Sequence, residues 1–313
     1  MLHLRAICPA ERTDQVLEAL KQHPGVTHVV LLVGAAVEPA GDVVEADVAR
    51  EATDTVVASL CELGIDRDGG VTLEQIDTAL SDAADRAEEK APGEAADAVV
   101  WEELLSRTGE ESRLNATFVS FLTIACLLAA VGVVTNSPIT IVGAMVVGPE
   151  FGPLAAIAVG LVLRRWDLVR RAATALAVGF PVAMAITAVA ALAGSFTELF
   201  DRGMVLAAHE VDFVFKVGPF SLIVALLAGA AGMLSMTSAK SAALVGVFIS
   251  VTTVPAAGFA AVAAVLGEWD ICLQSVAQLA VNLVGIVAAA ALVLALHNRR
   301  GQTRDLGRPL ANG

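Results

Sequence analysis

Basic residues are scarce in the first third of the sequence. Residues 1–112 contain 24 acidic and 8 basic side chains, whereas residues 113–313 contain 9 acidic and 12 basic ones. Nucleic acid is bound through basic surface, so this acidic part excludes a nucleic-acid partner. The same charge argues against its lying on anionic lipid. The chain therefore joins an acidic, water-soluble part to a nearly neutral, apolar part.

Cysteine pairs and catalytic signatures are also missing. The four cysteines form no CxxC pair, and we interpret them as small buried apolar residues. We find no nucleotide-binding loop, zinc-ligand spacing, Ser–His–Asp set or pair of catalytic carboxylates. The sequence thus predicts neither an enzyme nor a cofactor or metal. Without a signal peptide at the start, we expect the N-terminus in the cytoplasm.

Residues 1–77 alternate between strand and helix patterns. Strand patterns cover 2–8, 25–33, 41–49 and 70–76, and helical spacing of apolar residues covers 11–23 and 51–64. This βαββαβ order predicts a small α+β cytoplasmic domain of ferredoxin-like type, with an antiparallel sheet and two helices on one face. The turn "HPGV" at 23–26 resembles one found in ACT-type regulatory domains, which often pair with a second copy.

The open face of this sheet carries ionisable side chains. They are His3, Arg5, His28, Glu45 and Asp47. One interpretation is a solvated face with cross-strand charge pairs, and the other is a ligand or metal site. Residues 78–112 are predicted to be an acidic linker that ends in a juxtamembrane helix.

Six runs in the second part are long and apolar enough to cross a bilayer, which takes about 20 residues. They cover 115–135, 137–163, 168–194, 217–237, 241–266 and 271–297. If all six cross, ten basic residues fall on one side and two on the other, which places both termini in the cytoplasm. Making runs two and five re-entrant would move an arginine cluster outside, which the charge rule disfavours. We therefore predict a polytopic α-helical domain of six spans over 113–298, followed by a basic tail, 299–313.

An internal repeat is indicated by a shift of 103 residues. It places 141–169 on 244–272, so that Trp166-Asp167 meets Trp269-Asp270 in a chain with only three tryptophans. Three spans per copy is an odd number, so the second copy is expected to be inverted. Spans two and five would be interrupted at matching positions, a pattern typical of secondary transporters.

The two interruptions supply the candidate site. The first contains two Gly-Pro pairs and one acid, and the second is rich in hydroxyl side chains before a proline. The candidate substrate- or ion-binding residues are Gly148, Pro149, Glu150, Gly152, Pro153, Ser250, Thr252, Thr253 and Pro255, with Gln278 and Asn282 from span six. Glu150 is either a proton or cation site or a residue solvated in a side vestibule. The two amides either join the site or bridge helices.

The segments 136–160 ("NSPITIVGAMVVGPEFGPLAAIAVG"), 242–263 ("AALVGVFISVTTVPAAGFAAVA") and 278–286 ("QLAVNLVGI") resemble the DUF389 family of hydrophobic bacterial and archaeal membrane proteins. The resemblance covers about 113–298 and implies an architecture in a prokaryotic inner membrane, with no assigned activity. The recurrent family positions are matched by Gly143, Pro149, Gly152, Pro153, Pro255 and Asn282. Glu150 departs from the pattern, in which an apolar residue is usual.

Two functions remain open from the sequence. The first is a transport protein or channel for a small solute or ion, regulated by the cytoplasmic domain. The second is a membrane-anchored sensor or scaffold whose cytoplasmic domain binds a ligand or partner. In both cases the lipid bilayer is a partner, and we expect a homo-oligomer formed through membrane helices or cytoplasmic domains.

Overall fold

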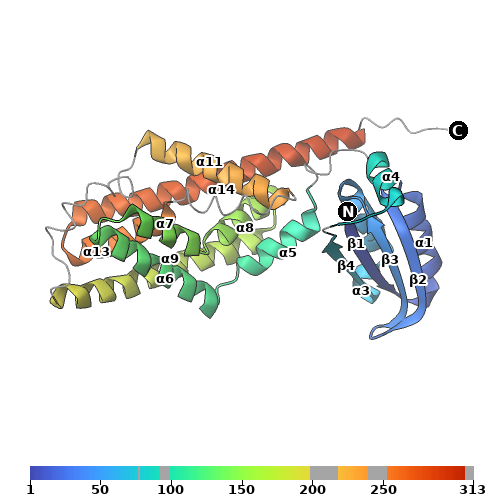
Figure 1. Cartoon of the computed structure of the whole chain (residues 1–313), viewed down its shortest axis with the longest axis horizontal. Helices are drawn as coiled ribbons and strands as arrows, with labels where there is room; N and C mark the ends of the chain where they lie inside the picture. The colour runs from blue at the N-terminus through green and yellow to red at the C-terminus, as the bar shows by residue number, and fades with distance from the viewer. Residues whose placement is uncertain (77, 92–98, 198–217, 239–251, 307–313) are drawn as a thin grey trace. The chain divides into compact units, whose positions relative to one another are not determined.

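A computed structural model describes residues 1–76, 78–91, 99–197, 218–238 and 252–306 of the chain (Figure 1). The chain divides into two compact units. The first is Met1–Leu104 together with a short segment that starts at Thr237. The second contains the rest of the chain from Leu105 onward.

A four-stranded antiparallel sheet forms the centre of the first unit. Its strands are β1 (Leu2–Cys8), β2 (Val26–Val37), β3 (Ala40–Val48) and β4 (Gly70–Gln75), in the spatial order β2-β3-β1-β4. The residues of β1 are buried alternately, as expected for a sheet with one covered face. The prediction of a small N-terminal antiparallel sheet is therefore confirmed.

Two main helices pack their apolar stripes onto the covered face. They are α1 (Thr13–Gln22) and α2 (Thr53–Glu62), each preceded by one 3-10 turn, η1 (Ala10–Arg12) and η2 (Arg50–Ala52). A short helix, α3 (Ile65–Asp68), follows α2. The core combines strand residues such as Leu4 and Val44 with helix residues such as Val16, Leu20 and Leu60, all fully buried. Burying this apolar area is what holds the unit together.

The open face carries cross-strand pairs. His3 lies opposite Asp47 in the register of β1 and β3, and its Nδ1 lies 2.9 Å from Asp47 Oδ1. The other carboxylate oxygen of Asp47 lies 2.7 Å from Nδ1 of His28. Among the described residues, no group of three or more His, Cys, Asp or Glu side chains is arranged to hold a metal ion. The arrangement therefore corresponds to the charge-pair interpretation of this face.

Two helices follow in the predicted linker, α4 (Asp82–Lys90) and α5 (Trp101–Glu111). Ser81 caps α4 by accepting hydrogen bonds from the amides of Ala83 and Ala84. At the start of α5, the amide of Trp101 donates to Oδ1 of Asp54 at 3.2 Å. The acidic linker thus contains defined helices with fixed N-termini.

The second unit is a bundle of apolar helices. Its members are α6 (Ala116–Val134), α7 (Pro138–Val147), α8 (Phe151–Val162), α9 (Trp166–Phe196), α11 (Pro219–Thr237), α13 (Thr253–Val265) and α14 (Trp269–Leu306). Four of them are long and apolar enough to cross a membrane, and the bent pair of α7 and α8 makes up to five. Of the predicted run 241–266, only α13 and the residues beside it fall within the described ranges. The chain is thus built like a multi-pass membrane protein.

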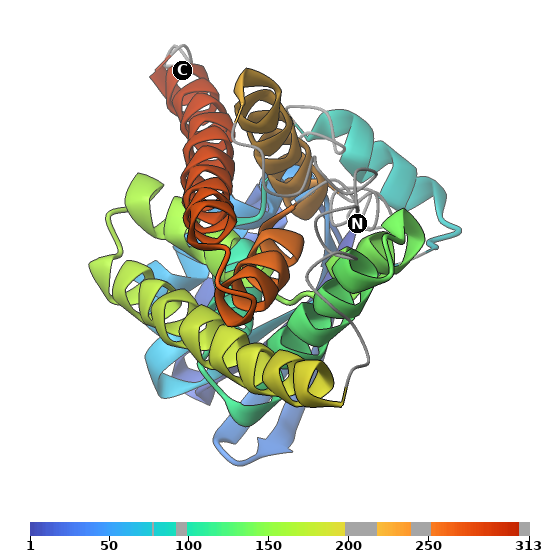
Figure 2. The ribbon, with the colours of Figure 1, turned by 90° about the vertical axis from the view of Figure 1, so that its left-hand side faces the viewer.

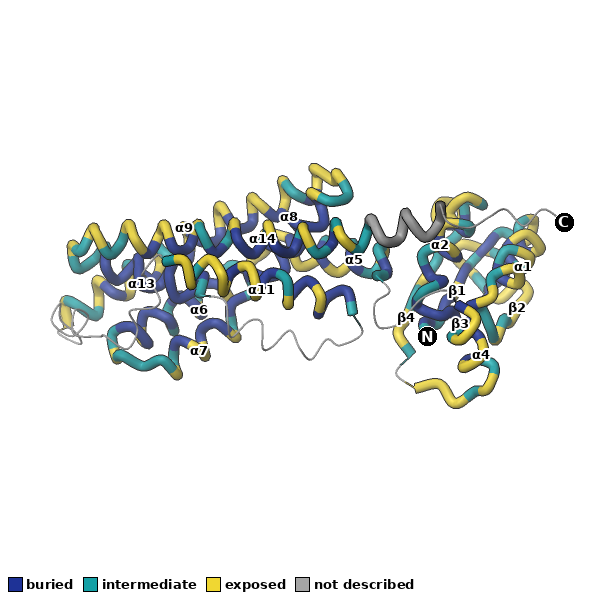
Figure 3. The backbone as a smooth tube through the Cα atoms, turned by 90° about the horizontal axis from the view of Figure 1, so that it is seen from above, coloured by how far each residue is buried: buried dark blue, intermediate teal, exposed yellow. Residues whose placement is uncertain are grey.

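The two short helices α8 and α13 lie inside this bundle. α13 packs against α14, α6, α9 and α7, and α8 packs against α9 and α14 (Figure 2). Nearly every residue of α13 is buried, whereas the long helices are buried on one side only (Figure 3). Gly258 permits the contact with α6, because a Cβ there would lie 2.8 Å from the carbonyl oxygen of Cys126. Short helices that are apolar on every side are expected in such a position.

Candidate functional site

The break between α7 and α8 is formed by three residues, Gly148, Pro149 and Glu150. The two helices meet at a bend of 52°. Pro149 has no amide hydrogen to donate and fixes its own φ, so a continuous helix cannot pass through it without losing a hydrogen bond. Pro153 lies in the first turn of α8, where amides have no partner inside the helix, and is tolerated there. The Gly-Pro pairs therefore end one helix and begin the next.

Glu150 lies at the N-terminus of α8 and faces the N-terminus of α13. Its side chain is 4% exposed, and its Oε1 accepts a hydrogen bond of 2.5 Å from the hydroxyl of Thr253. Its Oε2 is buried and has no hydrogen-bond partner among the described residues. Since a carboxyl group is costly to bury among apolar residues, one hydrogen bond compensates it only in part.

Glu150 and Val254 approach position 148 so closely that only glycine fits there. A Cβ at this position would collide with Glu150 Oε2 and would lie 2.8 Å from a methyl group of Val254. Both obstacles belong to the two buried helix starts. The glycine of the first Gly-Pro pair thus makes room for the carboxyl group and for α13 together.

A second set of polar side chains continues from Thr252, the residue before α13. Its hydroxyl accepts a hydrogen bond of 2.8 Å from Nδ2 of Asn282 on α14. Oδ1 of Asn282 accepts one of 3.2 Å from Nε2 of Gln278, which also donates to Ser221 on α11. Gln278 and Asn282 are one helical turn apart and at most 2% exposed. Four polar side chains from three segments are therefore linked inside an apolar bundle.

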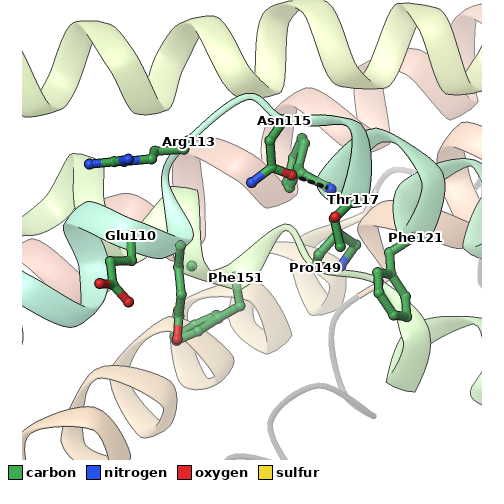
Figure 4. Close-up of a pocket in the computed structure, with 11 residues that line it drawn as sticks. Glu110, Arg113, Asn115, Thr117, Phe121, Pro149 and Phe151 are labelled. Carbon is green, nitrogen blue, oxygen red and sulfur yellow. Dashed lines mark hydrogen bonds between the residues drawn. The ribbon is translucent and has the colours of Figure 1, made fainter.

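A hollow of about 330 Å³ reaches the first break (Figure 4). It lies between the end of α5, the start of α6 and the α7–α8 break. Its lining combines charged or polar residues with phenylalanines and with glycine and proline of the break: Glu110, Glu111, Arg113, Asn115, Thr117, Phe118, Phe121, Gly148, Pro149, Phe151 and Gly152. Asn115 also caps α6 by accepting from the amide of Phe118 at 2.7 Å. The glycine and proline residues of the break therefore form part of the wall of this hollow.

The candidate residues fall into three groups. Gly148, Pro149 and Gly152 line the hollow. Glu150, Thr252, Thr253, Gln278 and Asn282 form the two hydrogen-bonded sets. Pro153 and Pro255 are buried in the first turns of α8 and α13, and Ser250 lies outside the described residues.

Part of this chain is similar to a known protein family. Residues 145–288 match the model of a family described as Domain of unknown function (DUF389). This part of the chain is therefore similar to the DUF389 family. The matched range contains α8, α9, α11 and α13, both helix starts that meet at Glu150 and Thr253, and the two amides of α14. Neither a curated protein nor a solved structure matches the chain.

Sequence reasoning missed Ser221 as a partner of the amides of α14. No motif marks it, since it lies in the first turn of an ordinary apolar helix and meets Gln278 only through the packing of α11 on α14. It also missed the contact between His28 and Ser81 in the first unit. Nε2 of His28 lies 2.9 Å from Oγ of Ser81, in addition to its contact with Asp47. These three residues come from three elements, so their proximity has no local signature.

Asp47 and Asp54 are carboxyl groups of the first unit whose pKa values shift in opposite directions. Burial acts to raise the pKa of Asp47, but the hydrogen bonds with His3 and His28 outweigh it and hold that pKa below its usual value. Burial raises the pKa of Asp54 to about 7, and the negative charge of Glu102 contributes to the rise. The charge of Asp54 therefore changes with pH near neutrality.

Proposed function

We propose that this protein is a membrane transport protein or channel for a small solute or ion. In this proposal the membrane domain has six spans in two inverted copies of three, and the site lies at mid-membrane between two broken helices. The domain of residues 1–77 regulates it from the cytoplasm. Both termini are then cytoplasmic, in the inner membrane of a prokaryotic cell.

The observation that carries the proposal is the hydrogen bond between Glu150 and Thr253. It joins the N-termini of two short helices that are buried in the bundle and surrounded by apolar residues. Helix N-termini carry unpaired amides and a partial positive charge, and transporters use such ends at mid-membrane to hold ions and polar groups. A protein that only anchors itself in the bilayer has no need of a buried acid at this place.

The helix bounds support two related copies. α6 and α11 begin 103 residues apart, at Ala116 and Pro219, and both contain 19 residues. α8 and α13 end 103 residues apart, at Val162 and Val265, and α9 and α14 begin 103 residues apart. This is the offset that aligns the sequence with itself.

Details of the backbone support the same relation. Arg164 and Gly267 differ by 103, and both have positive φ, at 56° and 74°. Each ends a short buried helix and leads into a long one. α8 and α13 extend toward opposite ends of the bundle from their meeting point, as inverted copies require (Figures 1 and 3).

The described residues of the two breaks differ in their contacts. The hollow reaches the first break through Pro149, whereas the residue 103 positions later, Thr252, is bonded to Asn282. The counterpart of Asn282 in the first copy is Gly179, which has no side chain to make the equivalent hydrogen bond. Different contacts at equivalent positions are expected of an alternating-access transporter, in which the two copies adopt different conformations.

A reconstitution experiment tests this proposal. The full-length protein in liposomes is screened for uptake of monovalent ions, divalent ions and small metabolites. Asn282→Leu removes the amide at the second break. It is compared with Gln274→Leu, which removes an amide at an exposed position of the same helix. We expect flux that only Asn282→Leu alters. Absence of flux for every solute, together with no labelling by water-soluble reagents of a cysteine placed at Pro149, would rule the proposal out.

The second candidate function is a membrane-anchored sensor or scaffold. It is favoured by strand β2, an edge strand that exposes apolar side chains, including Val33 at 77% and Val37 at 88%. Such a strand is suited to pairing with another chain, which also supports the proposed homo-oligomer. Val33→Lys tests this function by adding a charge to the exposed edge. If the variant loses a partner or its self-association while flux is unchanged, the first unit has the sensor or scaffold function and is not needed for transport.

A further inference from the structure

A second hollow lies beside the beginnings of α6 and α9. It has a volume of about 400 Å³ and is lined by four residues, Arg113, Leu114, Arg171 and Thr174. We propose that it binds the phosphate group of an anionic glycerophospholipid. This proposal is independent of whether the protein transports a solute.

The two arginines of this hollow form no ion pair with an acid of the described residues. Within the described part of the chain, neither guanidinium group lies within 4.0 Å of a carboxylate. Nearby arginines do have one: Arg107 pairs with Glu111 at 3.3 Å and Arg165 pairs with Asp167 at 3.5 Å. Two unpaired cations that line one hollow repel each other unless an anion lies between them. A phosphate fits, because guanidinium groups bind it through paired hydrogen bonds.

The position of the hollow favours a lipid over a free phosphate. Arg171 and Thr174 lie one turn apart near the start of α9, and Val178 and Val182 continue the same helix face into the apolar span. Val178 is 41% exposed and Val182 is 38% exposed, so this face is open to an acyl chain. Trp166 at the start of α9 is 60% exposed, as expected for a residue at the membrane surface. A lipid whose phosphate lies in the hollow can therefore place its acyl chain along this apolar helix face.

The hydroxyl of Thr174 restricts the headgroup. It donates to the carbonyl oxygen of Arg170 at 2.7 Å, so its proton is already used. It can therefore accept a hydrogen bond but not give one to the phosphate. A headgroup with its own hydroxyl, such as that of phosphatidylglycerol, satisfies this acceptor, whereas the choline of phosphatidylcholine cannot.

The test measures lipid retention by the full-length protein in detergent. Native mass spectrometry compares bound phosphatidylglycerol with bound phosphatidylcholine after equal additions of each. The variant Arg113→Gln/Arg171→Gln removes the proposed site. The variant Arg164→Gln/Arg165→Gln removes two charges of the neighbouring turn and serves as the matched control. Size-exclusion profiles and circular dichroism check that both variants fold.

We expect the first variant to lower the affinity for phosphatidylglycerol by about 25-fold, or about fivefold per arginine, and the control to lower it by less than threefold. Equal losses in both variants overturn the proposal in favour of general surface charge. Equal retention of phosphatidylcholine overturns the role of the anionic phosphate. Displacement by millimolar inorganic phosphate overturns the lipid as the source, since it would show that a free phosphate occupies the hollow.

Discussion

Glu150 and Thr253 are 103 residues apart in the sequence and share a hydrogen bond of 2.5 Å in the centre of the bundle. The same offset relates the helix bounds of the two halves of the membrane unit. Residues at equivalent positions of two copies touch each other only near the axis that relates the copies. On our proposal this hydrogen bond therefore lies close to a pseudo-twofold axis, where a movement of one half against the other is centred.

Breaking this hydrogen bond is expected to destabilise the membrane unit. Thr253→Val removes the donor and Glu150→Met removes the acceptor, whereas Glu150→Gln keeps an oxygen that can accept. A double-mutant cycle between Thr253→Val and Glu150→Met, measured by detergent unfolding, is expected to give a coupling of about 0.6–2 kcal/mol. Glu150→Gln should retain that coupling with Thr253. A coupling near zero in the cycle would mean that the two side chains do not interact in the folded protein.

Replacing Pro149 and Pro153 together with alanine is expected to straighten the α7–α8 pair. The bend of 52° then decreases, and the distance between spin labels at Ile139 and Leu161 grows by about 3–4 Å, given a rise of 1.5 Å per residue. Pulsed electron spin resonance in a background without native cysteines measures this distance. Any flux of the wild-type protein should be lost as well. Pro181→Ala in α9 is the control, and unchanged distance and flux would remove the broken helix from the mechanism.

The amides of α14 are expected to stabilise the protein through their partners. Asn282→Ala removes the hydrogen bonds that Asn282 makes with Thr252 and Gln278 in an apolar region. The cost is about 1–2 kcal/mol. Gln274→Ala removes an exposed amide about two turns earlier in the same helix and should cost less than about 0.5 kcal/mol. Comparable unfolding midpoints for the two variants would contradict the buried amide chain.

The stability of the first unit is expected to depend on Asp54. Its pKa is raised from an ordinary value of 3.8 to about 7 by burial, with a contribution from the charge of Glu102. The folded state therefore binds a proton more tightly than the unfolded state, and stability decreases as pH rises between about 4 and 7. Asp54→Asn keeps an oxygen that can accept from the amide of Trp101, but it removes the cost of burying a negative charge at high pH.

The difference in melting temperature between Asp54→Asn and wild type should therefore grow from pH 5 to pH 8, with the variant more stable at the higher pH. Differential scanning fluorimetry of the full-length protein follows this change. Glu45→Gln on the open face serves as a control for the loss of one negative charge. A difference that stays constant with pH would show that Asp54 does not titrate in this range.

Membrane topology gives a further test. Reporter tags inserted at residue 205 and fused to the C-terminus should report opposite sides of the membrane, because the six-span arrangement separates them by an odd number of spans. Alkaline phosphatase and green fluorescent protein fusions measure this in cells. The same side for both tags would refute six spans.

The sequence alone predicted the small antiparallel sheet and the approximate bounds of the long helices. Period-two burial in β1 and long apolar runs such as that of α6 are local patterns, and local patterns survive in the final fold. The bend at Gly148-Pro149 was also predictable, because proline acts on its own backbone. The inverted pairing of the copies stays a prediction, supported by the shared offset of 103 residues.

Contacts between distant segments were decided by the tertiary structure. The sequence marked Glu150 as a buried acid with unknown surroundings and Gln278 as an amide with no assigned partner. Only the packing of α8 against α13, and of α11 against α14, gave them Thr253 and Ser221. Likewise, the unpaired arginines at 113 and 171 share a hollow because α9 folds back beside the start of α6. Hydrophobic burial specifies which face of a helix is covered, but the polar pairs within that face depend on the register of packing, which side-chain shape determines.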